Sequence, residues 1–190
     1  MKLYEKYTLD CNDLIKRYCT ILLATQWDYR SVIIFRIAKD ASFMTALEEE
    51  MQRKNLPSIR AVSIFCRGPN NTQPPHIDTI DNNFTICNSG FYIPLINIGS
   101  KLVWSNPDTG VKAKSMIAPL FNTNKVSTSS LNVFYKNYTS NIIGEYDSHD
   151  PSIISTSVPH SAISTKYPKA AVAIRLHGNV DLFEHFNLRP

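Results

Sequence analysis

The sequence contains no apolar run approaching the ~20 residues that a helix needs to cross a bilayer, so we expect no membrane span. Its first residues also lack the apolar segment of a secretion signal, and we therefore expect a cytoplasmic protein. No internal repeat and no low-complexity segment interrupts the chain. These absences are typical of an ordinary globular protein.

Charge is scarce as well. Charged residues make up 19% of the 190 residues, the net charge is +4, and no block of like charges is present. The weak positive balance permits nucleic-acid binding but does not indicate it. Glu48, Glu49 and Glu50, followed by Arg53 and Lys54, predict a solvated helix face with i,i+4 pairs.

Cysteine is limited to four residues, and their spacing matches no zinc motif. In a chain without a secretion signal we expect them to be reduced and mostly buried. They are Cys11, Cys19, Cys66 and Cys87.

The hydrophobic pattern divides the chain into a helical third and a β-rich remainder. Leu9–Ala24 and Ser42–Asn55 have helical periodicity, with Ser42 as a candidate cap and Pro57 as a stop, while Ser31–Ala38 is β-branched. Short β-rich runs separated by turn residues follow, as in a sandwich or barrel. These runs are Ile59–Cys66, Asn83–Cys87, Gly90–Ile98, Lys101–Trp104, Leu131–Tyr135, Ile153–Val158, Pro159–Ser164 and Ala170–His177.

This pattern predicts a mainly β protein with flanking N-terminal helices, and its length suits a single domain, 1–190. We expect a helix-rich N-terminal buttress over 1–57, a jelly-roll core over 58–178 and a C-terminal tail over 179–190.

Two features of the β-rich region suggest a metal site. His76 and Asp78 are two residues apart, so a strand would direct both side chains to one face. His160 begins a late strand and could supply a third ligand. Taken separately, the first pair also fits a surface turn after Pro75, and an isolated histidine is more often a core or edge residue.

The last predicted strand, which includes Lys169–Arg175, carries charged residues that are unusual in a core strand. Alternation places Lys169, Ala171, Ala173 and Arg175 on one face. A cation directed into a sandwich needs an anion, and the alanines leave room for one. A solvent-facing position for Lys169 is the alternative reading.

Taken together, two histidines and one carboxylate match the facial triad of non-heme Fe(II) oxygenases. The pattern His76-x-Asp78, His160 and Arg175 resembles the Fe(II)/2-oxoglutarate-dependent dioxygenases. The resemblance covers residues 58–178. It is strongest with small phage and marine-microbial members, some of them similar to aspartyl/asparaginyl hydroxylases.

The resemblance implies a double-stranded β-helix (jelly roll) and a hydroxylase that couples decarboxylation of 2-oxoglutarate to oxidation of a substrate C–H bond, with O2 as cosubstrate. It implies that His76, Asp78 and His160 are the catalytic Fe(II) ligands. Arg175 would bind the distal carboxylate of 2-oxoglutarate, although Lys169 occupies the position where other members place this anchor. A phage-encoded protein would act in the host cytoplasm.

Further site residues remain open. The spacing of Lys169 and Arg175 resembles the two arginines of nucleic-acid demethylases, but Ser63 and Phe65 stand where those enzymes carry Asn and Tyr. Candidates for lining the cosubstrate or substrate pocket are Tyr92, Asn97 and Trp104, of which we expect at least two to be core residues.

The sequence defines neither the substrate nor the oligomeric state. A protein side chain, an amino acid and a nucleobase are all compatible with it. Candidate substrate loops are Asn70–Pro75, Asp78–Asn88 and Asn106–Ser130. Two other functions remain open: a cupin-like metalloenzyme that does not use 2-oxoglutarate, and a non-catalytic jelly-roll module for binding or structure.

Overall fold

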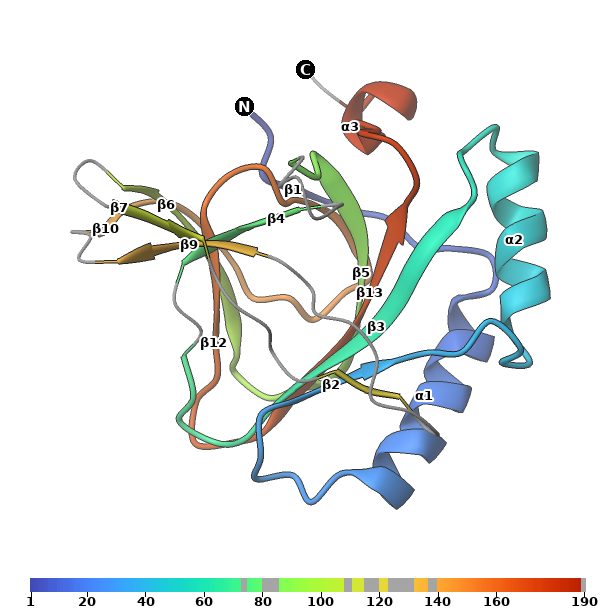
Figure 1. The fold of residues 1–190 in the computed structure, drawn as a ribbon, viewed down its shortest axis with the longest axis horizontal. Helices are drawn as coiled ribbons and strands as arrows, with labels where there is room; N and C mark the ends of the chain where they lie inside the picture. The colour runs from blue at the N-terminus through green and yellow to red at the C-terminus, as the bar shows by residue number, and fades with distance from the viewer. Residues whose placement is uncertain are drawn as a thin grey trace.

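The computed structural model describes residues 1–72, 75–79, 86–107, 111–114, 120–122, 132–136 and 140–188 (Figure 1). The helices are α1 (Asn12–Gln26), α2 (Met44–Arg53) and α3 (Leu182–His185). The strands are β1 (Tyr4–Lys6), β2 (Ile33–Arg36), β3 (Ile59–Arg67), β4 (His76–Asp78), β5 (Ser89–Asn97), β6 (Lys101–Pro107), β7 (Val111–Lys114), β8 (Leu120–Asn122), β9 (Asn132–Lys136), β10 (Ser140–Tyr146), β11 (Ser152–Ser155), β12 (His160–Ile163) and β13 (Lys169–Leu176).

The strands form two sheets, which confirms the prediction of a mainly β protein. The seven-stranded sheet has the order β1-β11-β5-β13-β3-β2-β8, and the six-stranded sheet has the order β10-β6-β12-β4-β9-β7. Among the described strand pairs all are antiparallel except β2 with β8. Strand β13 lies at the centre of its sheet, between β3 and β5 (Figure 1).

The larger hydrophobic core lies between the helices and the seven-stranded sheet. Helices α1 and α2 cover the outer face of this sheet (Figure 1). Fully buried aliphatic side chains of this kind each contribute about 1.5–3 kcal/mol to folding. The side chains that α1, α2 and the central strands share in this core include Ile15, Leu23, Leu47, Met51, Ile64, Val172 and Ile174.

A smaller cluster fills only part of the space between the two sheets. It contains Tyr92, Leu102, Trp104, Tyr146, Ile154, Val158 and Ala171. Because the helices supply a separate core on the outer face, the inner faces of the sheets can carry polar residues and a pocket.

Most predicted elements are present, with shifted boundaries. The two helices and the strand between them are confirmed, but α2 begins at Met44 with Phe43 before it and has no side-chain cap, so the capping role predicted for Ser42 is wrong. The strand predicted over Asn83–Cys87 lies largely outside the described residues. Strands β1 and β10 were not predicted, because their residues show no clear alternation of apolar and polar side chains.

The C-terminal tail is packed against the core. The Asp181 side chain accepts hydrogen bonds from the N–H groups of Phe183 and Glu184 and so caps α3. Leu182 and Phe183 are 1% and 3% exposed and belong to the core between helices and sheet.

The four cysteines are unpaired and buried, as the sequence predicts. Burial raises the pKa of Cys19 to about 12, and burial together with neighbouring Cys19 raises the pKa of Cys66 to about 12. Both thiols are therefore protonated and serve as small apolar groups.

None of the helices in the described part of the chain is long and apolar enough to cross a membrane.

Glu50 departs from the predicted solvated helix face, because it is fully buried. Its two carboxylate oxygens accept hydrogen bonds from the N–H groups of Asp10 (2.8 Å) and Cys11 (3.0 Å). Helix α1 has no side-chain cap of its own, so Glu50 of α2 satisfies this terminus and places a negative charge at the positive end of its dipole. Lys54 lies 3.6 Å from the same carboxylate.

We expect Glu50→Gln to lower the free energy of unfolding by about 1–3 kcal/mol, because an amide NH2 would face a backbone N–H donor. Urea unfolding measures this change. The exposed neighbour supplies the control, since Glu49→Gln should change the unfolding free energy by less than about 0.5 kcal/mol. Equal stability of the two variants would contradict the capping role.

Candidate metal centre

His76 and Asp78 occupy the two ends of the short strand β4. Alternation directs both side chains to its inner face, as predicted, and His76 Nε2 lies 3.4 Å from Asp78 Oδ1. Strand β4 is fixed at Asp78 by two backbone hydrogen bonds, from the Asp78 N–H to Thr156 O and from the Cys87 N–H to Asp78 O.

His160 reaches the same point from β12, where it is the register partner of His76. Its Nδ1 lies 3.0 Å from the carbonyl oxygen of Val158. A carbonyl can only accept, so Nδ1 carries the proton and Nε2 is left as a lone-pair donor. This Nε2 faces Asp78 Oδ1 at 4.0 Å.

The three side chains form one buried cluster. One ligand atom from each lies within 4.8 Å of the others. His76, Asp78 and His160 are 4%, 7% and 5% exposed. Two imidazole nitrogens and one carboxylate oxygen in this arrangement can hold a transition metal and leave coordination positions open.

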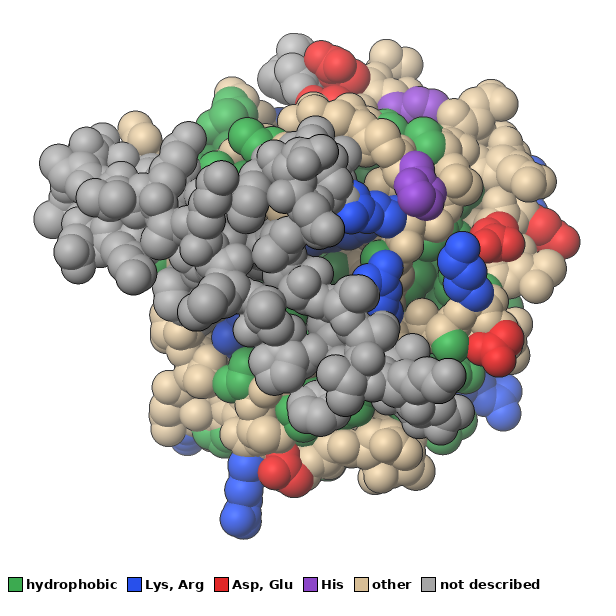
Figure 2. Space-filling view, viewed as in Figure 1, with side chains coloured by type: hydrophobic (Ala, Val, Ile, Leu, Met, Phe, Trp, Pro, Cys, Tyr) green, Lys and Arg blue, Asp and Glu red, His purple; other side chains and the backbone are tan. Residues whose placement is uncertain are grey.

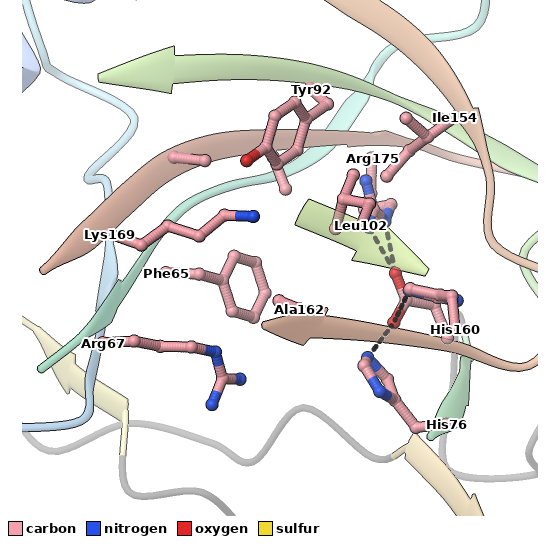
Figure 3. Close-up of a pocket in the computed structure, with 13 residues that line it drawn as sticks. Phe65, Arg67, His76, Tyr92, Leu102, Ile154, His160, Ala162, Lys169 and Arg175 are labelled. Carbon is pink, nitrogen blue, oxygen red and sulfur yellow. Dashed lines mark hydrogen bonds and ion pairs between the residues drawn. The ribbon is translucent and has the colours of Figure 1, made fainter. Parts of the chain in front are cut away.

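Arg175 holds the second oxygen of Asp78. Both its Nε, at 3.1 Å, and its Nη2 donate to Asp78 Oδ2 (Figure 3). Asp78 therefore directs Oδ1 toward the histidines and Oδ2 toward the guanidinium. Burial acts to raise the pKa of Asp78, but Arg175 and His76 hold it well below its usual range.

His160 is neutral near pH 7, because burial and the neighbouring His76 lower its pKa to about 4. An ionised carboxylate beside a neutral imidazole is the protonation state that metal binding requires.

Gly90 on β5 provides the space for the Arg175 guanidinium. A Cβ at this position would lie 2.2 Å from Arg175 Nη1 and 2.9 Å from Cζ. The sequence gives no local sign of this contact, because it joins two strands that are 85 positions apart in the chain.

The cluster lies at one end of a pocket between the two sheets, which has an empty volume of about 520 Å3 and is partly open to solvent. Its lining includes Phe65, Arg67, Tyr92, Lys169 and Arg175 (Figure 3). Lys169, Ala171, Ala173 and Arg175 all line it, which confirms the alternation predicted for β13.

Lys169 lies on the opposite side of the pocket from the histidines (Figure 3) and is 3% exposed. Its Nζ donates to the carbonyl of Lys101 and to Ser148 Oγ, both at 3.3 Å. Burial and the neighbouring Arg67 lower its pKa to about 7. The Tyr92 hydroxyl is also buried in this part of the pocket and has no partner at hydrogen-bond distance among the described residues.

Arg67 is a pocket residue that the sequence reading missed. It is the register partner of Lys169 across β3 and β13, and it is 9% exposed. Its Nη1 donates to Asn71 Oδ1 at 3.1 Å, and burial lowers its pKa to about 10. The signal was present in the sequence as a charge at the end of an apolar strand, two positions after Phe65.

Two other candidates lie away from the pocket lining. Asn97 donates to the carbonyl of Asp147 and to Ser148 Oγ, and so supports a turn. Trp104 is fully buried in the core between the sheets, where its Nε1 donates to the carbonyl of Ser155. Of the three candidates for lining the pocket, Tyr92 alone does so.

Of the predicted substrate loops, most of Asn106–Ser130 and part of the other two lie outside the described residues.

Comparison with known proteins gives similarity of fold only. No family model and no curated protein matches the sequence. Among solved structures, a Pseudomonas putida prolyl-4-hydroxylase matches with a TM-score of 0.51 and 10% identity over 92% of this chain and 93% of that one. This match shows a shared fold.

Two further solved structures match less closely. HygX from Streptomyces hygroscopicus, with nickel and 2-oxoglutarate bound, has a TM-score of 0.48 and 9% identity over 90% of this chain and 80% of that chain. The viral collagen prolyl hydroxylase of Paramecium bursaria Chlorella virus 1, in a 2-oxoglutarate complex, has a TM-score of 0.41 and 11% identity over 92% and 95% of the two chains.

We expect Gly90→Ala to weaken divalent-metal binding about tenfold, because the added methyl displaces the guanidinium that orients Asp78. Calorimetric titration with Mn(II) measures the affinity. In an Arg175→Met background the same substitution should have a much smaller effect, since there is no guanidinium left to displace and the carbonyl oxygen of Ile174, at 3.1 Å, is the other close contact of the added methyl. An unchanged affinity in Gly90→Ala, or an equal loss in both backgrounds, would contradict this role.

Proposed function

We propose that the protein is a non-heme Fe(II)- and 2-oxoglutarate-dependent oxygenase, and specifically a hydroxylase. The observation that carries the proposal is the layout of one pocket. A cluster of two histidines and a carboxylate lies at one end, and a buried ammonium, which has no acidic partner in the described part of the chain, lies at the other. A dicarboxylate that chelates a metal with one end needs the metal cluster for that end and a cation for its distal carboxylate.

The strand order supports a double-stranded β-helix for this core. Strands β3, β5, β11 and β13 belong to one sheet, and strands β4, β6, β10 and β12 belong to the other. From β3 to β6 and again from β11 to β13, consecutive members of this set alternate between the sheets, which is the winding of a jelly roll.

The donor set fits Fe(II) as the metal. We assign His76 Nε2, Asp78 Oδ1 and His160 Nε2 as the ligands, because these atoms converge. Fe(II) bound by two histidines and one carboxylate keeps positions open for a chelating cosubstrate and for O2. The Arg175 contact leaves Asp78 one oxygen with which to bind the metal.

We assign the distal carboxylate of 2-oxoglutarate to Lys169 rather than to Arg175. Arg175 already donates two hydrogen bonds to Asp78 through Nε and Nη2. Among the described residues Lys169 has two neutral acceptors, both at 3.3 Å, and the buried Tyr92 hydroxyl belongs to the same pocket. An ammonium and a hydroxyl donor together suit a carboxylate.

When bound, the iron and 2-oxoglutarate supply the oxidising chemistry that converts a C–H bond to an alcohol. The chain positions these groups and excludes water. Leu102, Ile154 and Ala162 line the pocket with apolar surface. Such a lining lowers the local dielectric, which strengthens the charge interactions of Lys169 and Asp78.

The test is anaerobic titration of the protein with Fe(II) and then 2-oxoglutarate, observed as the visible charge-transfer band of the chelate. We expect the band in the wild type and no band in His160→Ala. Lys169→Met removes the ammonium but keeps a side chain of similar volume, and it should weaken the binding of 2-oxoglutarate at least tenfold. The exposed Lys166→Met is the matched control and should bind normally.

The alternatives give different results in the same titration. Iron binding without the band would favour a cupin-like metalloenzyme. A folded wild-type protein that binds no iron would favour a binding or structural module.

The affinity for 2-oxoglutarate should fall as the pH rises. Only the ammonium form of Lys169 binds a carboxylate, and its pKa of about 7 means that this form is lost above neutrality. Binding then requires proton uptake, so the dissociation constant should rise by up to about tenfold per pH unit between pH 7 and 9. In Lys169→Arg this slope should disappear, because arginine stays charged. A pH-independent dissociation constant in the wild type would contradict Lys169 as the anchor.

A further inference from the structure

The proposed cofactors leave positive charge in the pocket. The described lining residues include three cations, Arg67, Lys169 and Arg175, but only one carboxylate, Asp78, which is paired with Arg175. The two negative charges of 2-oxoglutarate would offset the two positive charges of Fe(II). Arg67 and Lys169, which are 9% and 3% exposed, therefore remain as an excess of positive charge in the pocket.

Among the residues that the structure describes, Arg67 has no anionic partner to account for its burial. The one hydrogen bond of its guanidinium that the structure gives is to the amide oxygen of Asn71, and no carboxylate of the described residues lies within ion-pair distance. Burying an arginine without an anion is costly, which the lowered pKa of Arg67 also reflects. A structural role alone does not explain this residue.

Arg67 is placed apart from the proposed carboxylate anchor. In Figure 3 the Phe65 ring lies between the two cations, with the Lys169 ammonium on the side of Tyr92 and the Arg67 guanidinium on the side of His76. The hydrogen bond to Asn71 joins Arg67 to residues 69–72, which follow β3 and are partly or fully exposed. Lys169 instead contacts Lys101 and Ser148, beside other strands.

The surface carries cations beside the residues drawn in grey. Figure 2 shows some lysine and arginine side chains at the border of the grey residues in the middle of this face, and others nearer its edges, where the aspartate and glutamate side chains also lie. Exposed cations raise the local concentration of negatively charged ligands.

We propose that the Arg67 guanidinium binds an anionic group of the substrate, a carboxylate or a phosphate, and that the substrate of this oxygenase is therefore an anion. This inference rests on the proposed function and names a class of substrate for it. The planar guanidinium can bind either group through two parallel hydrogen bonds.

The test uses acetate and inorganic phosphate as separate probes of the anion site. The protein is first loaded anaerobically with Fe(II) and saturating 2-oxoglutarate, and the charge-transfer band gives the affinity for 2-oxoglutarate. Calorimetry then measures binding of each probe. We compare wild type, Arg67→Gln, Arg67→Lys and the control Arg60→Gln, which changes a residue of the same strand outside the pocket lining.

We expect saturable binding of at least one probe to the wild type and to Arg60→Gln. In Arg67→Gln this binding should weaken at least tenfold, while the affinity for 2-oxoglutarate changes less than threefold. Arg67→Lys should recover part of the binding. Preference for acetate or for phosphate identifies the anionic group. Urea unfolding verifies that each variant is folded.

Three results would overturn the inference. If Arg67→Gln weakens the binding of 2-oxoglutarate tenfold or more, Arg67 belongs to the cosubstrate site. If the wild type binds neither probe, or Arg67→Gln binds as well as the wild type, Arg67 is not an anion receptor. Absence of the charge-transfer band in the wild type, observed before any probe is added, would overturn the proposed function and this inference with it.

Discussion

The two faces of strand β13 set opposite requirements for their surroundings. The outer face carries Val172 and Ile174, which are fully buried beneath the helices, while the inner face carries Lys169 and Arg175. Charges on an inner face cannot provide the apolar burial that stabilises a sandwich. Helices α1 and α2 resolve this conflict, because they supply a separate core on the outer face. The space between the sheets is thereby left for the pocket.

The two inner cations of β13 are stabilised very differently. Arg175 forms an ion pair with Asp78 through Nε and Nη2, and Gly90 leaves the space that this pair needs. Lys169 has no anionic partner within the described ranges, and with its neighbour Arg67 it forms a buried pair of like charge. A buried charge without a partner lowers the free energy of unfolding unless a ligand compensates for it. A pocket that keeps such a destabilising charge is therefore typical of a functional site. The contrast supports a structural role for Arg175 and a binding role for Lys169.

Local patterns in the sequence were sufficient to predict much of the site. The spacing of His76 and Asp78 follows from the two-residue period of a strand, and the same period predicts the inner face of β13. Residues whose roles depend on contacts distant in the chain could not be predicted. Glu50 was interpreted as solvated because it belongs to a run of charged residues with i,i+4 spacing. Its hydrogen-bond partners, the N–H groups of Asp10 and Cys11, lie 40 and 39 positions earlier in the chain, just before α1. The contact between Gly90 and Arg175 likewise exists only once β5 and β13 are paired.

The central claim is that one dicarboxylate joins the two ends of the pocket. A crystal structure of the protein with Mn(II) and 2-oxoglutarate, grown without O2, tests it most directly. We predict the metal between His76, Asp78 and His160, with the distal carboxylate of 2-oxoglutarate on Lys169 Nζ and the Arg175 guanidinium still on Asp78. A metal bound elsewhere, or a distal carboxylate that displaces Asp78 from Arg175, would contradict the account.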